Sequence, residues 1–149
     1  MRYMMLMLPG AKAEAGILPD AKVFAAMAKY NEELQRAGVL LALDGLHPSS
    51  KGVRIAFSGG KRIVTDGPFT DAKEVIGGYW MIQVKSKEEA IEWAKRCPAS
   101  DGEAIELRRV YEASDFPPEL FSAELGAHEQ ALGGALRNEA PSSPRGPSA

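Results

Sequence analysis

Cysteine and histidine are scarce in this chain, and their scarcity excludes several kinds of site. Cys97 is the only cysteine among 149 residues, so neither an intrachain disulfide nor a multi-cysteine zinc site can form. The two histidines, His47 and His128, lie far apart in the sequence, which is a poor basis for a metal site. A lone cysteine is typical of a reducing compartment. We therefore expect a cytoplasmic protein that holds no metal and no other cofactor.

The sequence also lacks a charge excess and a long apolar run. It has 18 Lys and Arg against 20 Asp and Glu, so no overall field attracts nucleic acid, and we expect no nucleic-acid partner. The apolar stretch 1–8 is far shorter than the roughly 20 residues that cross a bilayer, and it does not continue as a signal peptide. We expect no membrane partner. What is abundant is hydrophobic residues, 45% of the chain, enough for one domain with a packed core.

Hydrophobic periodicity predicts an alternation of strands and helices. Val23, Met27, Tyr30 and Leu34 recur at helical spacing. Gly59 and the glycine after it predict a tight hairpin turn. The expected strands are 1–8, 39–43, 53–58, 61–65, 79–85 and a last strand through Ile105, Leu107 and Tyr111. The strand 39–43 is expected to be buried, and the strand 53–58 to have one solvated face. Helices are expected at 20–37 and 86–98, and a loop at 11–18.

This order predicts an α+β fold, a ferredoxin-like split βαβ repeat with an inserted hairpin. Two helices cover only one face of such a sheet, while the expected strands carry apolar residues on both sides. A second copy would cover the other face, so we expect a homodimer. Residues 113–149 form a separate C-terminal extension. Its first part predicts a helix from Pro117 to about Leu136, and its Pro- and Ser-rich end predicts a flexible tail.

Several segments in order resemble the YCII-related proteins of the DGPF type. They are 38–46, the Asp66-Gly67-Pro68-Phe69 turn with its flanks, Gly77-Gly78-Tyr79, and 90–94 through 105–108. The resemblance covers about residues 1–112. It implies a bacterial, cytoplasmic, dimeric α+β barrel, and in many members an association with an extracytoplasmic-function sigma factor.

The resemblance also bears on chemistry. In the broader YCII group, a histidine in the first helix and an aspartate at the end of the second are proposed as a catalytic pair, and one branch eliminates chloride from a ring-cleavage product. Met27 and Cys97 hold the matching positions in this sequence. Neither that pair nor that reaction carries over.

Polar residues around the hairpin suggest a site of another composition. Asp44, His47 and Asp66 are predicted to meet at one end of the sheet, with His47 and Asp66 as a catalytic acid–base pair. The alternatives are a plain loop histidine and an aspartate that braces its turn.

Four further residues are predicted to bind the ligand. Phe69 and Tyr79 would line the cleft beside Asp44, and Lys73 and Glu74 would clamp an anion, unless they are a solvated ion pair. The basic residues Lys51, Arg54, Lys61 and Arg62 are interpreted as an ordinary charged strand edge.

These residues allow two functions of different class. One is the binding or conversion of a small organic acid, without a cofactor, in a cleft near the dimer interface. The other is a regulatory interaction with a sigma factor, which rests on family analogy. The sequence does not decide whether the protein is an enzyme.

Overall fold

The computed structural model describes residues 1–69 and 74–120. Its elements are β1 (Arg2–Leu8), α1 (Ala11–Glu14), α2 (Ala21–Arg36), β2 (Leu40–Gly45), η1 (Ser49–Lys51), β3 (Val53–Ser58), β4 (Lys61–Asp66), β5 (Gly78–Gln83), α3 (Lys87–Lys95), β6 (Ala104–Arg109), η3 (Ala113–Asp115) and η4 (Pro118–Leu120). The chain divides into two units, 1–110 and 111–149.

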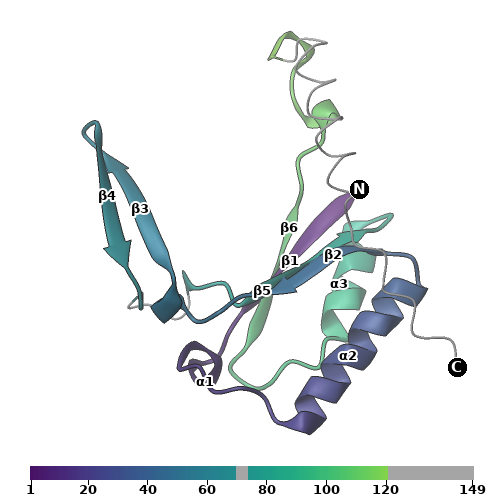
Figure 1. The fold of residues 1–149 in the computed structure, drawn as a ribbon. Helices are drawn as coiled ribbons and strands as arrows, with labels where there is room; N and C mark the ends of the chain where they lie inside the picture. The colour runs from purple at the N-terminus through teal and green to yellow at the C-terminus, as the bar shows by residue number, and fades with distance from the viewer. Residues whose placement is uncertain (70–73, 121–149) are drawn as a thin grey trace, which may run out of the picture. The chain divides into compact units, whose positions relative to one another are not determined.

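In the first unit, four strands form an antiparallel sheet in the order β2-β5-β1-β6. The helices α2 and α3 cover one face of this sheet (Figure 1). Each βαβ half is split by a strand of the other half, which is the ferredoxin-like arrangement predicted from the order of elements. The fold class is therefore confirmed.

Local signals determine where the helices begin and end. The Asp20 side chain accepts a hydrogen bond from the Val23 N–H at 2.9 Å, and Gly38, with φ 71°, follows the end of α2. Before α3, the Ser86 hydroxyl accepts from the Glu89 N–H at 3.1 Å. The Glu89 carboxylate reaches back to the Lys85 N–H at 2.8 Å, one residue before the expected partner of a capping box.

The core lies between the sheet and the helices. Tyr30 and Leu34 of α2 are buried against Met5 of β1 and Trp80 of β5. The Tyr30 hydroxyl donates to the Trp93 carbonyl oxygen at 2.7 Å, and burial raises the pKa of this phenol. The buried cluster comprises Tyr3, Met5, Tyr30, Leu34, Val39, Trp80, Ile82, Val84 and Ala90.

The structure corrects several of the predicted elements. Residues 11–18 are not a simple loop, because α1 forms within them. The segment 39–43 is not a fully buried strand: β2 is the edge strand, with a register shift between Leu40 and Ala42, and Leu41 is 37% exposed. α3 ends at Lys95, before Pro98, and Tyr111 lies beyond the end of β6.

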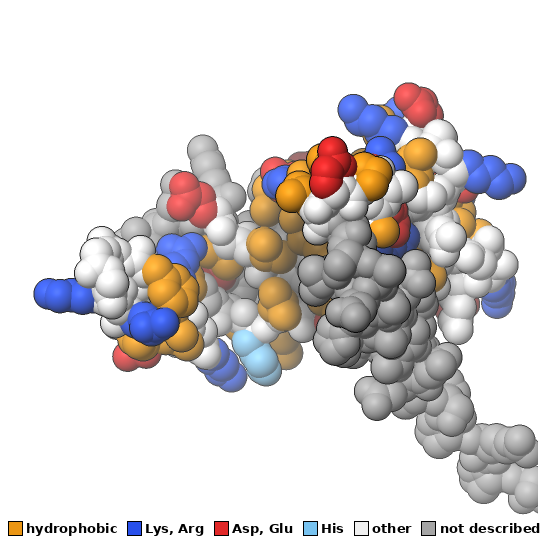
Figure 2. Space-filling model, turned by 90° about the horizontal axis from the view of Figure 1, so that it is seen from above, with side chains coloured by type: hydrophobic (Ala, Val, Ile, Leu, Met, Phe, Trp, Pro, Cys, Tyr) orange, Lys and Arg blue, Asp and Glu red, His pale blue; other side chains and the backbone are white. Residues whose placement is uncertain are grey.

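The hairpin of β3 and β4 forms its own two-stranded sheet. Gly59 and Gly60 have φ values of 55° and 75°, as a tight hairpin turn requires. The prediction of one solvated face is wrong, since every residue of both strands is exposed. No other strand of the described chain pairs with the hairpin, which explains its exposure. Figure 2 shows hydrophobic side chains among Lys and Arg at this end of the molecule.

The second unit is described only as far as residue 120. It contains η3 and η4, and the rings of Tyr111 and Phe116 lie 5.0 Å apart. The predicted helix to Leu136 and the flexible tail lie mostly outside the described residues.

Candidate functional site

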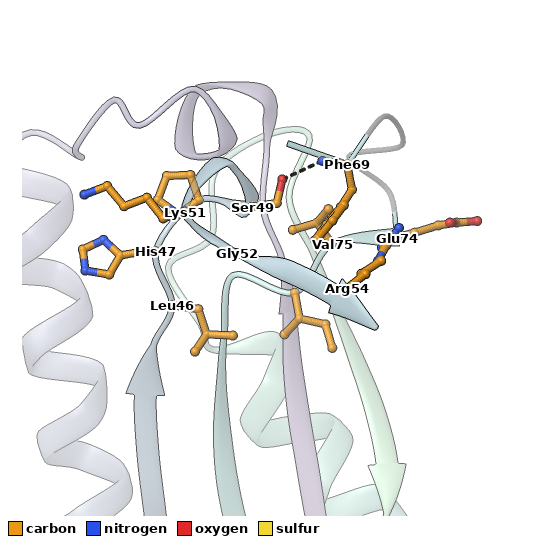
Figure 3. A pocket seen from close by; sticks show the side chains of 11 residues that line it. Leu46, His47, Ser49, Lys51, Gly52, Arg54, Phe69, Glu74 and Val75 are labelled. Atoms are coloured by element: carbon orange, nitrogen blue, oxygen red, sulfur yellow. Dashed lines mark hydrogen bonds between the residues drawn. The ribbon is translucent and has the colours of Figure 1, made fainter. Parts of the chain in front are cut away.

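A hollow of about 340 Å³ opens at the base of the hairpin, where the chain passes from β2 to β3 and from β4 to β5. His47 and Lys51 lie on one side of it, and Arg54, Phe69 and Glu74 on the other (Figure 3). The apolar part of its lining includes Leu46, Val75 and Ile76. The complete lining is Leu46, His47, Pro48, Ser49, Lys51, Gly52, Arg54, Phe69, Glu74, Val75 and Ile76.

The turn after β4 packs its backbone directly onto η1. A Cβ built at Gly67 would lie 1.7 Å from the Ser49 carbonyl oxygen, so only glycine fits without a shift of the backbone. The Gly67 N–H donates to the Gly52 carbonyl oxygen at 2.9 Å, and the Gly67–Pro68 peptide bond is cis. The Asp66-Gly67-Pro68-Phe69 turn thus makes a close backbone contact with a segment 18 residues earlier, at Ser49.

Ser49 joins three segments of the chain. It is buried, and its hydroxyl donates to the Glu14 carboxylate of α1 in a short hydrogen bond. The Ser49 N–H donates to the same carboxylate at 3.1 Å, and the Phe69 N–H donates to the Ser49 oxygen at 3.1 Å (Figure 3). The hydroxyl therefore both donates and accepts, which leaves little freedom to the Phe69 backbone.

Arg54 lies above the ring of Phe69. Its guanidinium carbon is 3.9 Å from the ring centroid, a cation–π contact. Among residues 1–69 and 74–120, no carboxylate forms an ion pair with this guanidinium. The lining contains two cationic side chains, Lys51 and Arg54, and one anionic side chain, Glu74, so its net charge is +1 when His47 is counted as neutral. The whole chain carries a net charge of −2.

The predicted site residues fall into separate places. His47, Phe69 and Glu74 line the hollow, and the imidazole of His47 is exposed. Asp66 ends β4 opposite Val53 and is not part of the lining. Lys73 lies outside the described residues.

Asp44 and Tyr79 form a pair of their own. The Tyr79 hydroxyl donates to Asp44 Oδ2 at 2.8 Å, and this hydrogen bond to the carboxylate raises the pKa of Tyr79. Because Trp80 next to it points into the core, Tyr79 points to the sheet face without helices. Within the described residues, no hydrogen bond joins His47 to Asp44 or Asp66, so the predicted group of three does not form.

The two residues predicted to stand at the positions of the proposed YCII catalytic pair lie beside the core. Met27 and Cys97 are half-buried and pack against the central cluster. Burial, with a smaller contribution from Glu103, raises the pKa of the Cys97 thiol to about 11, so it is not a thiolate at neutral pH. Cys97 is a packed thiol.

Sequence reasoning missed the residues that hold the site together. Glu14 fell in a segment interpreted as a loop, and Ser49 in a turn without assigned function. Lys51 and Arg54 were grouped with Lys61, which begins β4 beside the hairpin turn and does not line the hollow. The alternation of β3 identifies the face that carries Arg54, yet only the fold shows that Phe69 lies beneath it.

Residues 1–69 and 74–120 contain no group of three or more His, Cys, Asp or Glu arranged to hold a metal ion. No helix within the same residues has both the length and the apolar character needed to cross a bilayer.

Comparison with known proteins assigns the family. An uncharacterized protein of Rhizobium meliloti (strain 1021) is 26% identical over 102 residues, which are 66% of this chain and 82% of that protein. A solved structure of the 5-chloro-2-hydroxyhydroquinone dehydrochlorinase TftG from Burkholderia phenoliruptrix AC1100, in complex with 2,5-dihydroxybenzoquinone, is 15% identical. It covers 77% of this chain and 98% of its own, with a TM-score of 0.42. The YCII-related domain matches residues 1–114, and the chain therefore belongs to the family of proteins with a YCII-related domain.

Proposed function

We propose that this protein, as a DGPF-type member of its family, binds a small organic acid in the hollow at the base of the hairpin, without a cofactor. The observation that carries the proposal is a mostly apolar hollow with cationic side chains on both sides, Lys51 on one and Arg54 on the other. Specific ligand sites combine an apolar lining with a few polar groups that fix orientation. A positive lining in a chain of net charge −2 favours an anionic ligand.

His47 is the residue of this lining suited to exchange a proton with the bound acid. An imidazole changes its charge near neutral pH more readily than any other ordinary side chain. Its exposure leaves it free to meet a ligand from solvent. Conversion of the acid by proton transfer at His47 is the reaction class that the site supports best.

The proposal is tested by a thermal-shift screen of small carboxylic acids, each paired with its uncharged amide or alcohol. A ligand that binds only the native state raises the melting temperature. Acids but not their uncharged partners should stabilise the protein, and amide shifts in NMR should map to Leu46, Val75 and Ile76. His47→Ala should weaken binding severalfold at unchanged stability. Asp66→Asn, outside the lining, is the matched control and should leave affinity within about twofold. Binding of acids elsewhere on the surface would refute the proposal.

We further propose that the protein acts as a homodimer. Met4, Leu6 and Met81 point to the sheet face without helices, and each is only half-buried. Six-residue strands rise about 20 Å and four of them span about 19 Å, so this face offers nearly 400 Å². The two strands of the hairpin have the same length and add about 200 Å² on each of its two faces. The sheet face and both faces of the hairpin together approach the roughly 800 Å² per partner of a stable interface.

A regulatory interaction with a sigma factor is the second candidate function. The observation that favours a protein partner is the hairpin, where Val53, Phe57 and Val64 are 53%, 75% and 64% exposed on one face. Capture of a purified sigma factor by the native chain, and its loss in Phe57→Ser, would support this role. Equal capture by both proteins, or no capture, would refute the hairpin as the contact.

A further inference from the structure

We propose, building on the proposed function, that Arg54 is the residue that receives the carboxylate of the bound acid and that Phe69 holds its guanidinium in place. The ligand class that follows is a carboxylate with a compact apolar body. Arg54 lies at one side of the hollow, and Leu46 and Val75 lie between it and His47 (Figure 3). Ile76 also lines the hollow.

The position of Arg54 leaves its hydrogen-bonding edge available. Its guanidinium carbon lies 3.9 Å from the centroid of the Phe69 ring. A cation–π contact of this kind engages the flat face of a guanidinium, whereas its N–H donors lie in the guanidinium plane. These donors form a planar fork that matches a carboxylate in a bidentate pair. Within residues 1–69 and 74–120 no carboxylate occupies that fork.

The backbone that carries the ring beneath Arg54 is itself held. The Phe69 N–H donates to the Ser49 hydroxyl at 3.1 Å, and Ser49 is held by Glu14 through both its N–H and its hydroxyl. The backbone of the same turn is pressed against η1 at Gly67. A side chain held in its binding geometry before the ligand arrives loses less conformational freedom on binding, which raises affinity. Phe69 is thus a positioning residue, and Arg54 the binding residue.

The other charged residues of the lining fit this assignment. Lys51 lies on the opposite side of the hollow, beside His47 (Figure 3), and as a flexible ammonium without an aromatic support it is a point charge rather than a fork. Glu74 lies on the same side of the hollow as Arg54 (Figure 3). The apolar part of the bound acid lies over Val75 and Ile76.

The experiment uses benzoate as the probe and benzyl alcohol as its uncharged partner, with dissociation constants from NMR titrations of the full chain. Benzoate should shift the amides of Val75 and Ile76, and benzyl alcohol should bind at least tenfold more weakly. Arg54→Gln should lower benzoate affinity at least tenfold, and Arg54→Lys should recover only part of it, because lysine restores the charge without the fork. Lys61→Gln, which removes the same charge at the hairpin turn, is the control and should bind like the native chain.

Two substitutions of Phe69 distinguish the loss of Arg54 positioning from a general loss of folding. Phe69→Leu should lower affinity severalfold, whereas Phe69→Tyr, which keeps an aromatic face under the guanidinium, should retain it. Equal loss in both variants, or equal loss in Arg54→Gln and Lys61→Gln, would overturn the inference. If benzoate shifts Val75 and Ile76 equally well in Arg54→Gln, the proposed function survives and the assignment of Arg54 fails. If neither benzoate nor any other small acid shifts these amides in the native chain, both proposals fail.

Discussion

Substitution of Gly67 by alanine tests whether the turn after β4 is held by its contact with η1. The added Cβ would lie 1.7 Å from the Ser49 carbonyl oxygen and 2.6 Å from its carbonyl carbon, and neither backbone atom can move aside like a flexible side chain. Overpacking of this kind costs about 1 to 3 kcal/mol. The shift would also break the hydrogen bonds of the Gly67 and Phe69 N–H groups, each with a net contribution of about 1 kcal/mol. The expected loss is about 3 to 5 kcal/mol, a large part of the 5 to 15 kcal/mol typical of a folded domain.

The assay is urea unfolding combined with amide hydrogen exchange. A loss of that size lowers the midpoint by about 2 M for a slope of about 1.5 to 2 kcal/mol per molar. If the turn detaches without global unfolding, the loss appears instead as faster exchange of the Phe69 amide. Gly45→Ala is the matched control, because a Cβ at Gly45 meets nothing within 4 Å, and it should be neutral or stabilise by up to about 1 kcal/mol. An unchanged midpoint together with unchanged Phe69 exchange in Gly67→Ala would refute the reasoning.

Three further predictions concern the core, the thiol and the assembly. Tyr30→Phe removes the hydrogen bond to the Trp93 carbonyl and should lower the free energy of unfolding by about 1 to 2 kcal/mol in the same assay; no change would show that water replaces the hydroxyl. The pKa of Cys97 is raised from 9.0 to about 11 in the folded state, so the native thiol stays neutral. The stability that the neutral thiol contributes is complete below pH 9 and is lost as the pH rises through about 11. Cys97→Ala should flatten the fall in stability over that interval in urea titrations at each pH, and an identical fall in both proteins would contradict the shift. Met81→Glu, on the sheet face without helices, should convert the proposed dimer to a monomer in sedimentation velocity, and a variant that remains dimeric would assign the interface to another surface.

Much of the fold followed from local signals in the sequence. Asp20 and Gly38 bound α2 because a side-chain acceptor and a left-handed residue are local requirements of helix ends. Gly59 and Gly60 turn the hairpin for a similar local reason. The order of strands and helices then leaves few topologies, of which the ferredoxin-like sheet is the observed one.

The residues of the predicted site do not all lie together, because they come from segments whose contacts are not local. The predicted meeting of Asp44, His47 and Asp66 assumed that all three end strands of one sheet. Instead β4 belongs to a separate hairpin, and Asp44 pairs with Tyr79 across β2 and β5. A strand pattern specifies which side chains alternate, but not which sheet the strand joins.

The family, the order of the elements and the presence of a turn at Gly67 could be inferred from the sequence alone, since each depends on residues close together in the chain. The reason why that glycine is needed emerges from the fold, because the Ser49 carbonyl that excludes a Cβ is contributed by a distant segment. The fold also decided which of the basic residues faces a hollow. Arg54 and Lys61 are equivalent charges on one hairpin in the sequence, and they differ only because Phe69 is held beneath the first by Ser49 and Glu14.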